Sequence, residues 1–223
     1  MSGAGGIGVL GGTFDPIHLG HLRAAEEVRE AERLDEVRFV PAAVPPHKDG
    51  RGLTPATHRI RMVELAIANV PGFRVSRLEV DRPGPSYSVD TLRALRTEVG
   101  SDARIVFVVG WDAFADLHTW KEHASIFALC DVVVVTRPPS SAALSHEQIP
   151  LAAREAFWYD SSSEVFRHRS GHVLKRQVIT ALDISAASIR ARVAAGRSIR
   201  FLVPDAVAEY VAAHRLYRED PPR

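Results

Sequence analysis

Two histidines, His18 and His21, stand three residues apart shortly after a pair of glycines, Gly11 and Gly12. The glycines let a phosphate group approach the backbone closely, because they carry no side chain. The histidines open a charged amphipathic stretch, and residues three apart at the start of a helix face the same side. Both imidazoles could then donate hydrogen bonds to phosphate oxygens beside the positive end of the helix dipole. The segment predicts a phosphate-binding loop.

The same residues allow plainer interpretations. Gly11 and Gly12 could form only a tight turn, with both histidines bonded to nearby backbone groups. The H-x-G-H spacing favours anion binding instead, because histidine is a mediocre helix former and nothing local requires two. The loop matches neither the Walker phosphate loop nor the G-x-G-x-x-G dinucleotide fingerprint. No carboxylate or thiol stands at ligand spacing beside the pair, so we expect no protein-bound metal.

Further polar and aromatic residues follow other apolar runs. Lys48 ends a proline-stiffened segment that begins at Pro45, and the pattern fits a phosphate-facing loop as well as a solvated one. Asp112, two residues after Gly110, could accept hydrogen bonds from ribose hydroxyls. Trp120 offers a flat face to an aromatic ring, although a tryptophan at a helix start is more often a core residue. These segments are candidates for binding a nucleotide.

A capped helix start is predicted near the end of the chain. Ser185 is a suitable N-cap, and Arg190 falls within the first turns that follow it. An ordinary surface helix and a phosphate-binding helix both fit this pattern. The stretch opens a C-terminal helical part that we place at 184–223.

Short apolar, β-branched runs alternate with amphipathic helical patterns along the chain. This alternation predicts a parallel sheet covered on both faces, that is, a Rossmann-like doubly wound α/β fold in a single domain, 1–223. Strands one and four of such a fold are neighbours, so the loops after them should face each other across one crevice. The expected strands are 7–10, 37–40, 73–80, 105–109, 132–136 and 172–179, and the expected helices are 19–34, 55–69, 88–98, 120–129, 185–195 and 204–214.

The segment 138–170 interrupts this rhythm with proline-rich and serine-rich runs. We predict a variable excursion there, with a helix near 152–158, and assign it no chemistry. Cys130 is the single cysteine, which excludes an internal disulfide, and its place before an apolar run predicts a buried, inert thiol.

The composition limits the class of partner. Lys and Arg number 28 against 27 Asp and Glu, so no long-range field favours nucleic acid or an anionic membrane. The start of the chain is small and uncharged, and no apolar run reaches membrane-spanning length. We therefore expect a cytoplasmic protein that binds neither nucleic acid nor a membrane, and a homo-oligomer stays open.

Taken together, the motifs resemble those of bacterial nicotinate mononucleotide adenylyltransferases, within the nucleotidyltransferases that share H-x-G-H. The resemblance spans nearly the whole chain, in the family's order. It rests on Gly11-Gly12-Thr13-Phe14-Asp15-Pro16-x-His18-x-Gly20-His21, Pro45-Pro46-His47-Lys48, Ser86-Tyr87-Ser88-Val89-Asp90-Thr91-Leu92, Gly110-Trp111-Asp112 with Trp120, and Ile184-Ser185-Ala186-Ala187-Ser188-Ile189-Arg190.

The resemblance implies transfer of AMP from ATP to nicotinate mononucleotide, giving deamido-NAD and pyrophosphate in NAD biosynthesis, with Mg²⁺ accompanying ATP. It implies catalytic roles for His18, His21, Lys48 and Arg190. By the same resemblance, the ATP-binding residues are Gly11, Gly12, Thr13, Phe14, His18, His21, Ser185, Ser188 and Arg190. The mononucleotide-binding residues are Tyr87, Ser88, Gly110, Asp112 and Trp120.

Two alternatives remain beside this interpretation. Another H-x-G-H adenylyltransferase would use phosphopantetheine or nicotinamide mononucleotide as its acceptor. A regulatory module would bind nucleotide without turnover. The intact His18, His21, Lys48 and Arg190 argue against a module, because a binder needs no groups around the leaving phosphates.

Overall fold

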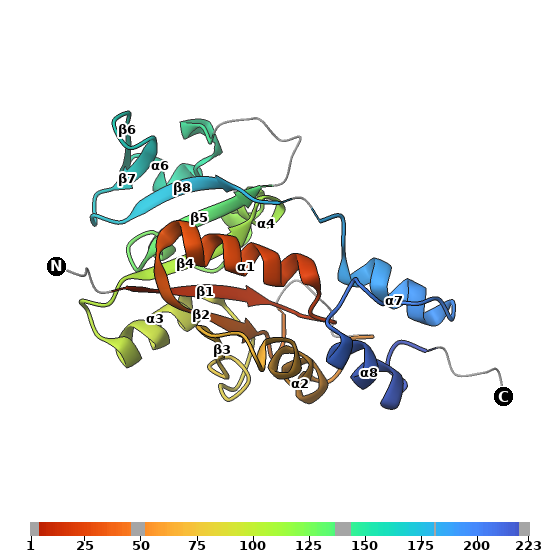
Figure 1. Ribbon diagram of the computed structural model, residues 1–223. Coiled ribbons are helices and arrows are strands. Elements are labelled where there is room, and N and C mark those ends of the chain that lie inside the picture. The colour runs from red at the N-terminus through yellow and green to blue at the C-terminus, as the bar shows by residue number, and fades with distance from the viewer. Residues whose placement is uncertain (1–4, 46–51, 137–143, 181, 219–223) are drawn as a thin grey trace.

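The computed structural model describes residues 5–45, 52–136, 144–180 and 182–218. An eight-stranded sheet forms its centre, in the order β3-β2-β1-β4-β5-β8-β7-β6 (Figure 1). The six strands from β3 to β8 of this order are parallel, and β7 and β6 continue the sheet in antiparallel pairing. The strands are β1 (Gly6–Gly12), β2 (Leu34–Pro41), β3 (Phe73–Val75), β4 (Ile105–Gly110), β5 (Asp131–Thr136), β6 (Phe157–Asp160), β7 (Val165–His168) and β8 (Val173–Val178).

Helices cover both faces of this sheet, because alternate side chains of a buried strand point to opposite sides. In β4, Val106 and Val108 join one core with α1, α2, α7 and α8, whereas Phe107 and Val109 join the other with α3 to α6. Helix α1 crosses the face turned to the viewer in Figure 1. The helices are α1 (Leu19–Glu32), α2 (Ala56–Ile67), α3 (Ser88–Val99), α4 (Trp111–Ala115), α5 (His123–Ile126), α6 (Leu151–Arg154), α7 (Ala186–Ala194) and α8 (Asp205–Ala213).

The direction of winding reverses between β1 and β4. These strands pair directly, with Leu10 opposite Val108, while β2 and β3 extend the sheet on one side and β5 and β8 on the other. The predicted Rossmann-like doubly wound α/β fold and the predicted contact of strands one and four are therefore confirmed. The C-terminal helical part is also present, as α7 and α8, within the described residues.

Two predicted elements are shorter than expected. The strand predicted at 73–80 ends at Val75, and the next amide, Ser76 N–H, still donates to the Phe39 carbonyl at 2.8 Å before the chain turns away. The helix predicted at 120–129 spans only His123–Ile126. Trp120 is extended and Glu122 has a positive φ of 46°, so the helix begins after both. Both elements are therefore shorter than predicted because the backbone leaves the regular conformation, after Ser76 in the strand and before His123 in the helix.

The excursion contains a hairpin that the sequence did not predict. A helix does form, as α6, but Phe157 and Trp158 belong to strand β6, which pairs antiparallel with β7. The serine-rich run forms the turn between them, where the Asp160 carboxylate accepts a bond from the Ser162 N–H at 3.1 Å. The prediction of helix through Trp158 was therefore wrong, while 137–143 lies outside the described residues.

Two smaller findings bear on the remaining predictions. The Cys130 thiol is fully buried, as predicted, and burial raises its pKa above the ordinary value. None of the helices in the described parts of the chain combines the length and the apolarity needed to cross a bilayer.

Candidate active site

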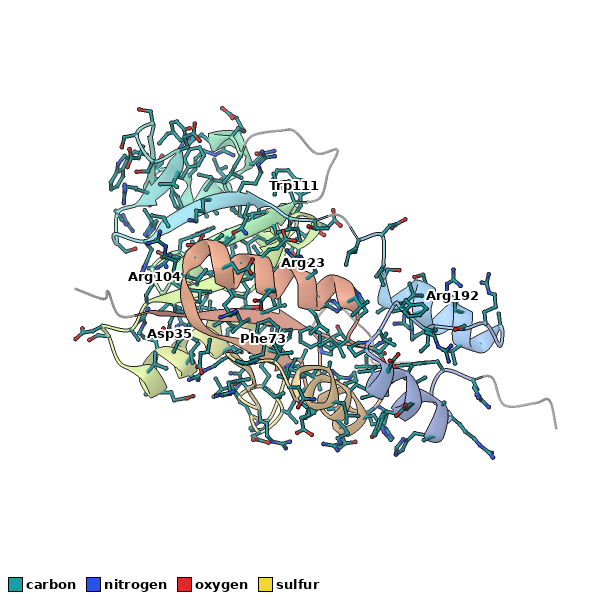
Figure 2. The ribbon with its side chains drawn as sticks, viewed as in Figure 1. Arg23, Asp35, Phe73, Arg104, Trp111 and Arg192 are labelled. Carbon is teal, nitrogen blue, oxygen red and sulfur yellow. The ribbon has the colours of Figure 1, made fainter. Side chains whose placement is uncertain are left out.

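A cavity of about 740 Å³ opens at the carboxyl ends of the central parallel strands. Both adjacent strands, β1 and β4, line it, and so do the loops that follow them. Arg104 and Trp111, labelled in Figure 2, mark the two ends of β4, and the cavity lies at the Trp111 end. The prediction that these two loops share one crevice is confirmed, and this is the edge of an open α/β sheet where ligands bind.

Both predicted histidines line the cavity. His18 is the extended N-cap residue of α1, and His21 lies in the first turn. Their rings stack with centroids 3.6 Å apart. The backbone N–H of His18 donates to His21 Nδ1 at 3.3 Å. A Cβ at Gly20 would lie 3.1 Å from the His18 ring, so the glycine of H-x-G-H makes room for this pair. The first turn of α1 has no acidic residue to compete with an anion.

The backbone of the glycine loop borders the cavity, as a phosphate-binding loop requires. Gly11, Gly12 and Thr13 line the cavity, and a Cβ on Gly11 would meet no atom within 4 Å. Phe14 is buried beneath them instead, with its ring edge-on to His21 at 5.1 Å and tilted against Phe39. Phe14 therefore supports the His21 ring from the core, and a contact between Phe14 and ATP stays a prediction.

Arg59, in α2, fastens the glycine loop to its neighbours. The residue is 1% exposed, and its guanidinium donates to the carbonyls of Thr13 and Thr54 at 2.8 Å and of Ala43 at 3.2 Å. Burial lowers the pKa of Arg59, and the negative charge of Asp15 opposes this. Arginine is not deprotonated in proteins, so the group stays charged. One buried cation thus connects three segments beneath the cavity.

The wall opposite the histidines carries the predicted mononucleotide-binding residues. Tyr87 and Ser88 come from the start of α3, while Gly110 and Asp112 come from the start of α4. Two helix N-termini therefore face the cavity with their positive ends.

Trp120 completes this wall. Its ring is half-buried, packs edge-on to Phe107 at 6.4 Å and lines the cavity. Trp120 therefore has a core contact and also borders the cavity, and stacking of an aromatic ring on it stays a prediction.

The predicted residues of α7 lie beside the first loop rather than in the cavity lining. Ser185 caps the helix, accepting a bond from the Ser188 N–H at 3.1 Å, and Arg190 donates to the Asp15 carbonyl at 2.7 Å. The Ile184 carbonyl lies 3.9 Å from a Cβ built on Gly20, so the helix start is next to H-x-G-H. Lys48 lies outside the described residues. Phosphate contacts of all four side chains stay predictions.

Several lining residues were not recognised in the sequence, and three of them, Glu79, Lys121 and Thr136, carry polar groups into the wall. Glu79 is buried and accepts a 2.7 Å bond from the Thr91 hydroxyl. Lys121 carries a cation next to Trp120. Thr136, at the end of β5, lines the cavity with a buried hydroxyl that has no hydrogen-bond partner in the described structure. Only Lys121 carried a signal, its place beside Trp120, because the other two reach the cavity through tertiary packing.

The residues present do not build a metal cage. Among the described residues, no group of three or more His, Cys, Asp or Glu could hold a metal ion. A divalent cation at this site would be held by phosphate oxygens and water, which is how Mg²⁺ commonly binds beside nucleotides.

Comparison with known proteins places the chain in a family. The family model described as cytidylyltransferase-like matches residues 9–192. A relative from Geobacter sp. (strain M21), named probable nicotinate-nucleotide adenylyltransferase, is 48% identical over 211 residues, which cover 95% of this chain and 97% of that protein. A relative of the same name from Syntrophotalea carbinolica is 48% identical over 212 residues, again 95% and 97% of the two chains.

Solved structures show the same fold at low identity. Plasmodium falciparum nicotinic acid mononucleotide adenylyltransferase complexed with NaAD aligns with a TM-score of 0.70 and 17% identity over 96% of this chain and 97% of that one. The family match, the two relatives and the paired histidines at the switch point of the sheet agree: the chain belongs to the cytidylyltransferase-like family, among the nicotinate-nucleotide adenylyltransferases.

Proposed function

We propose that this protein transfers AMP from ATP to nicotinate mononucleotide, giving deamido-NAD and pyrophosphate for NAD biosynthesis. The observation that carries the proposal is that one and the same cavity joins an H-x-G-H helix start to a wall bearing Trp120, Tyr87 and Ser88. One side of the cavity suits a triphosphate, and the other suits a pyridine nucleotide. The relatives at 48% identity, which match over nearly their whole length, support the same activity.

The reaction needs alignment more than it needs a base. A phosphate oxygen of nicotinate mononucleotide attacks the α-phosphorus of ATP, a new P–O bond forms, and the bond from that phosphorus to the leaving pyrophosphate breaks. The attacking phosphate is already largely dianionic near neutral pH, since its second pKa is about 6. The protein must hold two anions in line and stabilise charge on the transferred phosphorus and the leaving group.

The residues of the first loop suit this task. We assign His18 to the reacting phosphorus and His21 to a neighbouring phosphate, because their stacked rings border the cavity beside the backbone of Gly11 and Gly12. Lys48 and Arg190 are proposed to meet the triphosphate. Arg190 would have to do so beside its bond to the Asp15 carbonyl, which places its guanidinium next to the loop.

ATP is proposed to enter as its Mg²⁺ complex, with the metal counted as part of the substrate. On the acceptor side, Trp120 would stack on the pyridine ring, and Ser88, at the start of α3, would meet its carboxylate. Asp112 and Glu79 are the carboxylates of the cavity wall that could accept bonds from ribose hydroxyls. A cytoplasmic location stays a prediction of the sequence, which fractionation of cells would test.

Pyrophosphate release tests the proposal directly. The purified protein is given Mg²⁺ and ATP with nicotinate mononucleotide, nicotinamide mononucleotide or phosphopantetheine, each in turn. We expect the highest kcat/KM with nicotinate mononucleotide. Preference for either other acceptor would reassign the enzyme within H-x-G-H adenylyltransferases, and binding of ATP without turnover on any acceptor would favour a regulatory module.

The role of His18 has its own test. His18→Ala should lower kcat by about 10²- to 10³-fold, the usual loss when one group that stabilises transition-state charge is removed, while the Kd of ATP changes much less. His118→Ala is the matched control, because His118 is an exposed histidine of the opposite loop outside the cavity lining. Near-normal turnover in the His18 variant would remove His18 from the reacting phosphorus.

A further inference from the structure

Asp15, in the loop between Gly12 and His18, is bonded by three segments that are distant in sequence. Its side chain accepts a bond from the Tyr217 hydroxyl at 2.7 Å on Oδ1 and from the Thr54 N–H at 3.4 Å on Oδ2. Its carbonyl accepts the bond from Arg190 at 2.7 Å. Asp15 is 3% exposed, so these partners take the place of water around a buried carboxylate.

Tyr217 reaches this carboxylate from the other end of the chain, in the segment after α8. Its backbone is left-handed, with φ of 62°, a conformation that is unfavourable for a residue with a Cβ and persists where surrounding contacts fix it. Its hydroxyl also lies 3.9 Å from Met62 Sδ in α2. Burial and the neighbouring Asp15 charge raise the pKa of the Tyr217 phenol, so the hydroxyl keeps its proton and can donate it.

Asp15 is close in sequence to the residues of the first loop that line the cavity. Asp15 precedes His18 by three residues, and only Phe14 separates it from Gly11 to Thr13, which line the cavity. Removing the Tyr217 hydroxyl would leave a buried carboxylate oxygen short of its donor, and the loop would have to move to find water. A displacement of about 1 Å at a reacting group can cost about a hundredfold in rate.

We infer that Tyr217 is a positioning residue for adenylyl transfer: its hydrogen bond to Asp15 holds the first loop so that His18 faces the α-phosphorus of ATP. This inference rests on the proposed function. It assigns to the C-terminal segment a part in catalysis without contact to either substrate, since Tyr217 is not among the residues that line the cavity.

Tyr217→Phe and Tyr210→Phe form a matched pair of variants. Each loses one hydroxyl from the C-terminal helical part, but the Tyr210 hydroxyl bonds His58 Nδ1 at 2.9 Å, away from the first loop. We expect Tyr217→Phe to lower kcat by roughly ten- to a hundredfold with the KM for nicotinate mononucleotide within about twofold. Tyr210→Phe should keep kcat within about twofold. Each variant is assayed well below its own melting temperature.

A second substitution examines the same bond from the other side. Asp15→Asn keeps the shape of the side chain but replaces one carboxylate oxygen by an NH2 group, which cannot accept a hydrogen bond. The side chain can then no longer accept from both Tyr217 and Thr54, so kcat should also fall. The double variant Asp15→Asn/Tyr217→Phe should be no slower than the slower single variant, because both substitutions weaken the same contact between Asp15 and the C-terminal segment. Fully multiplicative losses, or wild-type kcat in Tyr217→Phe, would overturn the inference.

Hydrogen exchange of the protein without substrates gives a readout independent of activity. The amides of Thr13, Phe14, Asp15, Ile17 and His18 should exchange at least about tenfold faster in Tyr217→Phe than in wild type, and at the wild-type rate in Tyr210→Phe. Unchanged exchange in Tyr217→Phe would overturn the inference. If wild type failed to turn over nicotinate mononucleotide while the exchange result held, the proposed function would fail and the structural contact would stand.

Discussion

Lys121 places a positive charge on the same wall of the cavity as Trp120 and Tyr87. Its ammonium lies 2.9 Å from the Asp90 carboxylate and 5.0 Å from the centre of the Tyr87 ring. A carboxylate on a bound pyridine ring would gain from this charge, and a neutral carboxamide would not. The Lys121 side chain is 41% exposed and its ammonium is already paired with the Asp90 carboxylate. Solvent screening therefore limits the gain to about 1 kcal/mol or less.

We therefore expect Lys121→Gln to lower kcat/KM for nicotinate mononucleotide by about two- to fivefold and to leave the value for nicotinamide mononucleotide unchanged. Steady-state kinetics with both acceptors measures this. Arg93→Gln is the control, since Arg93 pairs with Asp90 and Glu122 on the same surface but is not among the lining residues. Equal losses on both acceptors would show that Lys121 does not distinguish the ring substituent.

At the scale of elements, Arg59 joins the start of α2 to the loops after β1 and β2. A lysine carries its donors on one nitrogen and cannot span carbonyls on three segments. Arg59→Lys should lower the free energy of unfolding by about 2–4 kcal/mol, because buried carbonyls lose their donors. Arg61→Lys, two residues further along the helix and paired with an exposed Glu64, should change it by about 0.5 kcal/mol or less. Urea titration measures the free energy of unfolding of both variants. Equal losses in the two variants would contradict the role of Arg59.

The difference between these two arginines shows what the sequence could not supply. Periodicity and capping signals predicted α1, α2, α3, α7 and α8 to within a few residues, because those signals are local. Arg59 and Arg61 stand on one amphipathic pattern, and only contacts with Thr13 and Ala43, 46 and 16 residues away, distinguish them. The bond between Tyr217 and Asp15 spans 202 residues and carries no local signal at all.

The candidate site divides in the same way. The glycine loop, both histidines and Asp112 were predicted because they follow strands at one edge of the sheet, whereas Tyr87 and Ser88 were named only through the family resemblance. Trp120 was predicted as an aromatic face in the loop after β4. Glu79 was missed because it lies in the irregular segment that replaces the second half of a predicted strand. The hairpin of β6 and β7 was missed because a short apolar run does not distinguish helix from strand.

At the scale of the whole molecule, the two edges of the sheet carry different groups. The cavity occupies the carboxyl edge, while a charge network occupies the amino edge, where Arg104 pairs with Glu32 at 2.7 Å and with Asp131 at 3.0 Å. His172 adds a contact to Asp131 at 3.4 Å and Lys175 a contact to Glu32. The six residues of β4 separate the two edges by about 20 Å. Substitutions at such a separation act independently as a rule.

Asp131 makes this independence testable. Burial alone would raise the pKa of its carboxyl, but hydrogen bonds from His172, the Val173 N–H and Arg104 outweigh burial and hold the pKa below its ordinary value. A carboxyl with a depressed pKa in the folded state stabilises the fold above its unfolded pKa of about 3.9, and this contribution is lost as the pH falls through the folded pKa. Wild type should therefore lose stability steeply below about pH 4.

Asp131→Asn should cost about 1–3 kcal/mol of the free energy of unfolding at pH 7, and its stability should fall less steeply than that of wild type below about pH 4. Its kcat at pH 7 should equal that of wild type, because the substitution lies at the edge opposite the cavity. Asp81→Asn, which removes an exposed partner of Arg77, serves as the control and should leave stability nearly unchanged. Urea titrations from pH 3 to 8 and pyrophosphate release measure the two properties. A loss of kcat in folded Asp131→Asn would show that the edges are coupled through the sheet, and wild-type stability at pH 7 would show that the network does not hold the amino edge.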